Sequence, residues 1–327
     1  MKRSTLIKLA SLMAVGGVFS SPVARAQSPA DRPLTLVVPF PAGTPADILA
    51  RALADEIQVS SKRTVVVDNR AGASQLVGAS YVASSAPDGN TLLMLLEPAV
   101  FSASALKAQP FASVTDFEAV AHVASVPNFL AVAPGLPVSN LKEFIALLKA
   151  NPGKYNFGSA GTGSAGHLFL EMLNKEAGIK AVHVPYKSFL QALTDTMSGE
   201  VSYLFSPLSS MQFVKQGKLK AMAIAAPVRD PDHPGLVTFD ESGLKGIDAI
   251  LQYMIVAPKG TPAAAVNRVN AAINGALASA TFVTKVKAIG GVTIPNAHPP
   301  AQARALLARE DQRWKGVVKS QNIDLAQ

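Results

Sequence analysis

The sequence predicts an α/β protein of two lobes, each built on a mainly parallel sheet flanked by helices, with a ligand cleft between the lobes. Two observations carry this prediction. Short apolar runs alternate with helix-like segments from Pro33 onward, and prolines at 127, 134 and 137 interrupt the alternation. Continuous apolar runs are typical of strands buried on both faces, and their alternation with helices is typical of parallel sheets. The length of 327 residues suffices for two ordinary domains.

The first half is predicted to form a β-α-β-α-β unit. Strands are expected at 34–40, 64–69 and 91–96, with helices at about 45–58 and 75–85 between them. The helical segment at 45–58 places apolar residues on one face, and the strand segment at 34–40 is a continuous apolar run. This order is the core of a doubly wound parallel sheet.

The second half repeats the alternation. Helix 140–150 is expected to begin after Ser139 as its capping residue, with Glu143 at the capping-box offset. Residues 227–247 are rich in Pro, Asp and Gly and are expected to form a loop. The other predicted elements are strands at 155–159, 180–186, 201–206, 219–226 and 250–258, and helices at 164–177, 188–198, 262–279 and 299–318.

These elements predict three regions. Residues 1–26 form a signal peptide, residues 27–124 form the first lobe with 245–327 returning to it, and residues 125–244 form the second lobe. The chain is expected to cross between the lobes near 119–127 and 226–250, which makes these two segments the predicted hinge.

The N-terminus has the three parts of a secretory signal. Lys2, Arg3 and Lys8 precede an apolar stretch at 9–19, and Ala24-Arg25-Ala26 supplies the small residues that signal peptidase requires. The apolar stretch is too short to cross a bilayer of about 30 Å. We expect a mature N-terminus at Gln27 and a soluble protein in the periplasm. The alternative is an uncleaved anchor.

Composition excludes several classes of function. The chain has no cysteine, so it has neither a thiolate nucleophile nor a Cys-ligated zinc site. The net charge is +8, and the four basic residues of 1–26, unaccompanied by acids, leave +4 on the rest. No run rich in Lys and Arg predicts a nucleic-acid partner. The five histidines show no metal-ligand spacing, so no metal is expected.

Residues 161–166 read Gly-Thr-Gly-Ser-Ala-Gly and satisfy G-x-G-x-x-G between a predicted strand and a helix. A dinucleotide site is one interpretation, but the next strand ends in Tyr186-Lys187 and lacks the acid that would bind a ribose. A second interpretation is a merely tight turn. The third is a seat for an anion such as a carboxylate, made by backbone N–H groups and the helix N-terminus. No cofactor is expected.

A serine hydrolase is the alternative from another functional class. Ser159 and Ser164 lie in this glycine-rich turn, and His167 follows one helical turn later. The nucleophile elbow requires G-x-S-x-G, and neither serine has the first glycine. His167 is expected either to face the anion seat or to serve as a cap or packing residue.

The end of the first strand is the second candidate segment. Residues 37–51 pass from an apolar strand through a Pro/Gly turn into a helix, with Thr44 and Asp47 at the helix start. Asp47 is expected to favour the helix N-terminus electrostatically. The free backbone groups of the turn are the candidate ligand contacts.

Six motifs in order resemble one family over nearly the whole mature chain: VPFPAGTPADILAR, VVVDNRAGASQLVG, APDGNTLLM, NFGSAGTGSAGHLFLE, HVPYKS and APKGTP. The chain is similar to Bug-type periplasmic solute-binding proteins, the extracytoplasmic components linked to tripartite tricarboxylate transporters. The resemblance implies a type II periplasmic-binding-protein fold that closes on a small carboxylate without catalysis. It also implies transient contact with membrane transporter subunits and a monomer. A sensor that presents its ligand to a receptor is the remaining alternative.

The resemblance implies two facing loops, 40–47 and 159–164, as the ligand site. The chain departs from the family at Thr44, at 71–74, at Asn90, at Ser188 and at Ser206, and its third strand delivers Glu97. Because Glu97 would repel a second carboxylate, we expect a ligand with one carboxylate and a neutral or cationic donor near Glu97. The alternative is that Glu97 faces solvent or pairs with a basic residue. The predicted ligand-binding residues are Phe40, Ala42, Gly43, Thr44, Asp47, Glu97, Ser159, Gly161, Thr162, Gly163, Ser164, His167 and Ser206.

Overall fold

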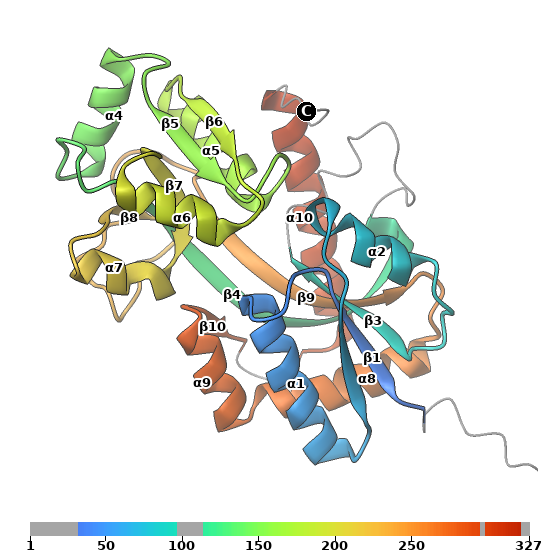
Figure 1. The fold of residues 1–327 in the computed structure, drawn as a ribbon. Coiled ribbons are helices and arrows are strands. Elements are labelled where there is room, and N and C mark those ends of the chain that lie inside the picture. The colour runs from blue at the N-terminus through green and yellow to red at the C-terminus, as the bar shows by residue number, and fades with distance from the viewer. Residues whose placement is uncertain (1–31, 97–113, 295–297, 322–327) are drawn as a thin grey trace, which may run out of the picture.

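A computed structural model describes residues 32–96, 114–294 and 298–321. Its strands form one curled sheet in the order β2-β1-β3-β9-β4-β7-β5-β6, with β8 and β10 also paired to β4 (Figure 1). Helices cover both faces of this sheet, and the two ends of the sheet belong to two lobes (Figure 1). The predicted two-lobed α/β class is confirmed.

The first lobe contains the predicted β-α-β-α-β unit. Strands β1 (Leu34–Val38), β2 (Val65–Asn69) and β3 (Thr91–Leu96) are mutually parallel, with β1 in the middle, and β9 (Ile250–Pro258) pairs antiparallel with β3. The other elements before β4 and after β9 are α1 (Pro45–Ser61), the short helices at Ala73–Gln75 and Val114–Asp116, α2 (Leu76–Ala83), α8 (Ala263–Leu277), α9 (Ala280–Ala288), β10 (Val292–Thr293) and α10 (Pro300–Gln321). Helix α9 and strand β10 were not predicted.

The second lobe repeats the parallel trio. Strands β5 (Asn156–Ser159), β6 (Val182–Pro185) and β7 (Tyr203–Pro207) are parallel, with β5 in the middle. The other elements are α4 (Leu141–Ala150), α5 (Ala165–Ala177), α6 (Phe189–Ser198), the short helices at Leu208–Ser210 and Met211–Lys215 (α7), and β8 (Lys220–Ile224). The predicted cap of α4 is wrong by one residue. Asn140 accepts from the N–H of Glu143, whose carboxylate accepts from the N–H of Ser139.

The long strand β4 (Phe117–Val132) runs through both lobes and was not predicted as a strand. It pairs antiparallel with β9 as far as Pro127 and with β7 from Asn128 onward. The proline that was expected to break the chain lies where the strand exchanges partners, because there its missing N–H costs the ladder least.

Register fixes the direction of the two parallel trios. Because β9 is antiparallel to both β3 and β4, β3 runs in the same direction as β4, whereas β7 runs in the opposite direction. Leu96 at the end of β3 is level with Tyr253, and the ladder continues from there to Pro127 and Asn128. The carboxyl ends of both trios therefore point toward the crossing at 127–128, where open parallel sheets bind ligands.

The central strands β1 and β3 are apolar throughout because both of their faces are buried, whereas the edge strands β2 and β6 are partly exposed and carry polar residues. In β1, Leu36 and Val38 pack with α1, α8 and α9, whereas Val37 faces the core that α2 and α10 share with the second lobe. The same alternation holds in β3 and β9. In the described ranges, no helix is both long enough and apolar enough to cross a membrane.

Candidate functional site

Two equivalent loops occupy the carboxyl ends of the middle strands of the two trios. One loop (residues 39–44) joins β1 to α1, and the other (residues 159–164) joins β5 to α5. Figure 1 shows the β1–α1 loop on the side of the first lobe that faces the second lobe. Each loop leads into a helix N-terminus, which carries partial positive charge. The chain thus presents two such termini toward the crossing.

Asp47 holds the β1–α1 loop from inside. Asp47 is buried, with 3% of the residue exposed. Its carboxylate accepts hydrogen bonds from the N–H of Gly43 (2.9 Å), from Arg51 Nε (3.0 Å) and from Asn69 Nδ2 (2.9 Å). Burial alone would raise the pKa of Asp47, but the hydrogen bonds from Arg51, Gly43 and Asn69 outweigh it and lower that pKa. Asp47 therefore orders the loop and its side chain is occupied.

The outer part of the same loop offers backbone groups. Asn69 Nδ2 also donates to the carbonyl of Phe40 (3.0 Å), and Thr44 Oγ1 donates to the carbonyl of Pro41 (2.8 Å). Ala42 and Gly43 are exposed, and Gly43 has φ +81°, a conformation that favours glycine. The side chains of this loop organise its backbone, and the exposed backbone at 42–43 faces outward.

The β5–α5 loop is organised in the same way. Ser164 caps α5 by accepting from the N–H of His167, and the N–H of Ser164 donates to the carbonyl of Gly161. Gly161 (φ +110°) and Gly163 (φ +76°) make the corners of the loop. The N–H of Gly161 donates to Ser159 Oγ (3.2 Å), and that of Gly163 donates to His167 Nδ1 (3.1 Å).

This arrangement refines the predicted anion seat. The amides of Gly161 and Gly163 turn into the loop, so they support its shape instead of lining its surface. The first-turn amides of a helix have no partner within the helix, and in α5 these belong to Ala165 and Gly166, both half-buried. Thr162, between the two glycines of the loop, is half-buried as well.

His183 contacts the β5–α5 loop from the neighbouring strand, and it was not among the predicted site residues. From β6, His183 Nε2 lies 2.7 Å from Ser159 Oγ, and its ring stacks on His167 with centroids 3.9 Å apart. Burial lowers the pKa of both histidines to about 4, and for His167 the neighbouring His183 adds to the shift. The sequence places His183 in the predicted strand that follows the one containing Ser159. Its closeness to Ser159 becomes apparent only when β5 and β6 are paired in parallel.

Ser206 and Glu97 are the two predicted residues that belong neither to the two loops nor to the helices that follow them. Ser206 lies near the end of β7, paired with Phe129 of β4 at the crossing. It is fully buried, and its hydroxyl has no hydrogen-bond partner within the described part of the chain. Glu97 lies outside the described residues, so its predicted role stays a prediction.

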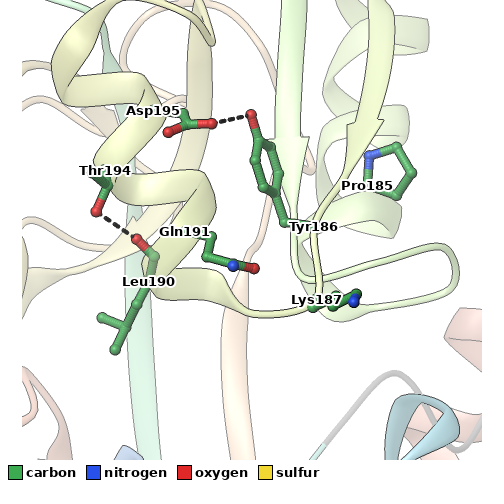
Figure 2. Close-up of a pocket in the computed structure, with 7 residues that line it drawn as sticks. All are labelled: Pro185, Tyr186, Lys187, Leu190, Gln191, Thr194 and Asp195. Atoms are coloured by element: carbon green, nitrogen blue, oxygen red, sulfur yellow. Dashed lines mark hydrogen bonds between the residues drawn. The ribbon is translucent and has the colours of Figure 1, made fainter.

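A surface depression of about 570 Å³ adjoins the β5–α5 loop (Figure 2). Pro185, Tyr186 and Lys187 form one wall and the first turns of α6 form the other. The N–H of Tyr186 donates to the carbonyl of Ser159, which ties this wall to the loop. Tyr186 donates its hydroxyl to Asp195 Oδ2 (2.7 Å), and burial together with this bond raises the pKa of Tyr186 to about 12. The side chain of Lys187 is exposed.

A second depression of about 310 Å³ lies between α1 and α8, beside Leu34. Because Leu34 begins β1, this depression is at the amino end of the sheet, where parallel sheets do not bind their ligands. Among the residues that the structure describes, no three His, Asp or Glu side chains gather in a way that could hold a metal ion.

Known proteins with the same architecture are similar to this chain along its length. BugT of Bordetella pertussis is 34% identical over 328 residues, covering 98% of this chain and 100% of BugT. An R. palustris protein solved with adipate is 30% identical, with a TM-score of 0.80 over 89% of this chain and 98% of its own. MatC from Rhodopseudomonas palustris with bound malate is 30% identical, with a TM-score of 0.78 over 88% and 99%.

The model of the TctC family matches residues 49–323, a span that begins within α1 and includes the whole β5–α5 loop and the N-terminus of α5. The confirmed two-lobed fold, the full-length similarity to BugT and this match agree. The chain belongs to the tripartite tricarboxylate transporter family receptors.

Proposed function

We propose that this protein is a periplasmic receptor that binds a small carboxylate between the β1–α1 and β5–α5 loops and delivers it to a tripartite tricarboxylate-type transporter. The observation that carries the proposal is the convergence of these two loops on the crossing at 127–128. Two helix N-termini suit an anion, because the first-turn N–H groups have no partner within the helix and carry partial positive charge. Lys187 adds a cation beside the β5–α5 loop.

Relatives support the ligand class. The R. palustris protein solved with adipate and MatC with bound malate both hold carboxylates. The departures at Thr44 and Ser206 lie in the β1–α1 loop and at the crossing, so the ligand of this chain is expected to differ in the part remote from the carboxylate. The expectation of a single carboxylate with a donor near Glu97 is tested by Glu97→Gln, which should weaken a cationic ligand or improve a dicarboxylate about tenfold. Unchanged affinities for both classes would place Glu97 outside the site.

Closure of the two lobes is the proposed capture step. Two segments cross between the lobes: β4 at 127–128 and the return at 225–249. Asn128 fastens them, since its Nδ2 donates to the carbonyl of Ala249 (2.6 Å) and its carbonyl accepts from Ala225. A ligand favours the closed state only by its difference in affinity between closed and open states.

Binding without turnover is part of the proposal. A serine hydrolase needs an accessible nucleophile, and Ser159 is 3% exposed with its hydroxyl shared among Gly161 and His183. Ser164 uses its hydroxyl to cap α5. These contacts favour a structural role for both serines. The protein is further proposed to act as a monomer. If it instead serves as a sensor, the ligand site stays the same and the membrane partner is a receptor in place of the transporter.

Ligand capture is tested by thermal shift and calorimetry on residues 27–327 with malate, adipate, benzoate and aspartate, with product analysis of each mixture. The proposal expects a saturable rise in melting temperature with one of these probes and no chemical change. Conversion of a probe, or no binding of any carboxylate in a wider panel, would overturn it. Export is tested separately by N-terminal sequencing of a periplasmic extract, which should begin QSPADRP. Full-length protein retained in the inner membrane would contradict a periplasmic receptor.

A further inference from the structure

Two imidazoles lie face to face under the β5–α5 loop. His167 comes from the first turn of α5 and His183 from β6, and their ring planes differ by 7° at a centroid separation of 3.9 Å. Phe157 of β5 continues the stack on the His183 side, at 4.9 Å from that ring. One helix and two strands thus contribute to a single aromatic stack. Each imidazole also has a polar contact with one end of the loop.

The contact of His167 fixes its protonation state. A backbone N–H is always a donor, so the nitrogen that accepts from Gly163, Nδ1 of His167, carries no proton. The ring proton is therefore on Nε2, which lies 3.9 Å from Glu171 Oε1. A second proton on Nδ1 would place two donors against each other and break the bond to Gly163.

The contact of His183 follows from the single proton of Ser159. The Ser159 hydroxyl is 3.0 Å from the carbonyl of Gly161, which can only accept, and we assign the single hydroxyl proton to that bond. Nε2 of His183, 2.7 Å from the same hydroxyl, must then be the donor. In this tautomer His183 cannot remove a proton from Ser159.

We propose that His167 and His183 are positioning residues of the carboxylate site: as a stacked neutral pair, they hold Gly163 and Ser159 at the two ends of the β5–α5 loop and thereby fix the N-terminal turn of α5. The inference rests on the proposed function for its ligand, but the two ring tautomers and the two loop contacts are properties of the unliganded protein. Burial of the pair, with His167 4% exposed, keeps both rings neutral. Neutral rings add no charge of their own to the loop, whose neighbouring charged side chains are Lys187 and Glu171.

The first experiment measures the tautomers in the unliganded wild-type protein by two-dimensional ¹H–¹⁵N NMR of the imidazoles. Both rings are expected to be neutral at pH 7 with the proton on Nε2. A proton on Nδ1 of His167, or a His183 protonated only on Nδ1, would overturn the proposal. This measurement needs no variant and no ligand. It therefore tests the proposed tautomers even if no carboxylate ligand has been found.

The second experiment compares His167→Asn, His167→Leu and, as a control, His233→Leu, which removes a histidine that contacts Asp230 in the 227–247 loop. Asparagine keeps an acceptor at the height of Nδ1, and leucine does not. The readouts are hydrogen exchange of the Gly163 amide and affinity for malate or adipate, whichever binds the wild type.

His167→Leu should expose the Gly163 amide to exchange and weaken binding about tenfold, the equivalent of one lost hydrogen bond of about 1.4 kcal/mol. His167→Asn should restore both readouts to within about threefold, and His233→Leu should change neither. Equal protection of Gly163 in the leucine and asparagine variants would overturn the proposal. If neither probe binds the wild type, the affinity arm uses whichever carboxylate of the wider panel binds, and the exchange comparison still decides the role of His167.

Discussion

The carboxylate of Asp47 accepts a hydrogen bond from the backbone N–H of Gly43 at 2.9 Å, four residues earlier. This bond closes the β1–α1 loop on the first turn of α1. The same carboxylate binds Arg51 and Asn69, so every partner of Asp47 is a donor. The loop is therefore held by one buried negative charge, and its exposed backbone is left for other contacts.

Replacement of Asp47 by asparagine should destabilise the protein by about 1–3 kcal/mol, because an amide has one acceptor oxygen where three donors converge. Asp55→Asn, an exposed change on the same helix, is the matched control and should shift stability by less than about 0.5 kcal/mol. Urea unfolding at pH 7 measures both. Equal effects of the two substitutions would show that the charge at 47 does not hold the loop.

Strands β1 and β3 could be predicted because burial on both faces leaves a continuous apolar run, as in 34–38 and 91–96. The strand β4 could not be predicted in this way. Its identity depends on pairing with β9, which lies more than a hundred residues later, and its internal Pro127 is a strand breaker unless the partner exchange is known. The helix α9 was missed because it follows α8 after only two residues.

The two loops of the site could be located from glycine placement and strand ends, but the roles of their residues could not. Gly163 was expected to offer its amide to a ligand, and the structure gives that amide to His167. This pairing depends on the angle at which α5 leaves the strand. His183 is an unremarkable strand residue until β6 is placed beside Ser159. Side-chain roles within a loop are set by such tertiary neighbours, which periodicity does not report.

Gly161→Ala should separate loop shape from stability when it is compared with Gly199→Ala. Both glycines have positive φ, +110° and +91°, so alanine should cost each about 1 kcal/mol or more. A Cβ added at Gly161 would meet only the carbonyl oxygen of Tyr186, at 3.5 Å, and a Cβ added at Gly199 would meet open space. Gly199 lies at the end of α6, far along the lobe from the carboxyl edge.

We therefore expect similar losses of stability from the two alanine substitutions and a loss of carboxylate affinity of about tenfold or more from Gly161→Ala alone. Thermal denaturation and calorimetry with a carboxylate that binds the wild type measure the two effects. Unchanged affinity in a folded Gly161→Ala protein would remove this corner of the loop from the site.

Acid should destabilise the folded state through three histidines. Burial lowers the pKa of His122, His167 and His183 from 6.5 to about 4. Between these values the unfolded chain binds protons that the folded chain does not, so the free energy of unfolding falls as the pH drops from 6.5 to 4. Above pH 6.5 the contribution is fully present. Glu171, whose pKa is raised by burial, contributes with the opposite sign.

The contribution of His167 to this pH dependence is isolated by the substitution His167→Asn. The decline in unfolding free energy between pH 6.5 and 4 should become smaller by up to roughly 3 kcal/mol, because each unit of pKa shift corresponds to about 1.4 kcal/mol. Urea unfolding at intervals of half a pH unit provides the curve. His233→Leu serves as the control and should follow the wild type. A variant curve parallel to that of the wild type would mean that His167 titrates normally in the folded protein.

Gln75 clamps the end of β3 from a backbone conformation that L-residues rarely adopt. It has φ +80°, it is buried, and its side-chain amide donates to the carbonyl of Leu96 (2.8 Å) and accepts from the N–H of Leu96 (3.2 Å).

Gln75→Leu keeps the backbone strain and loses both bonds, so it should cost about 2–4 kcal/mol. Gln75→Gly loses the bonds but relieves roughly 1 kcal/mol of strain, so it should be the milder change. Gln58→Leu, on the exposed face of α1, is the control and should be close to neutral. Urea unfolding ranks the three variants, and a glycine variant less stable than the leucine variant would show that the positive φ of Gln75 carries no strain.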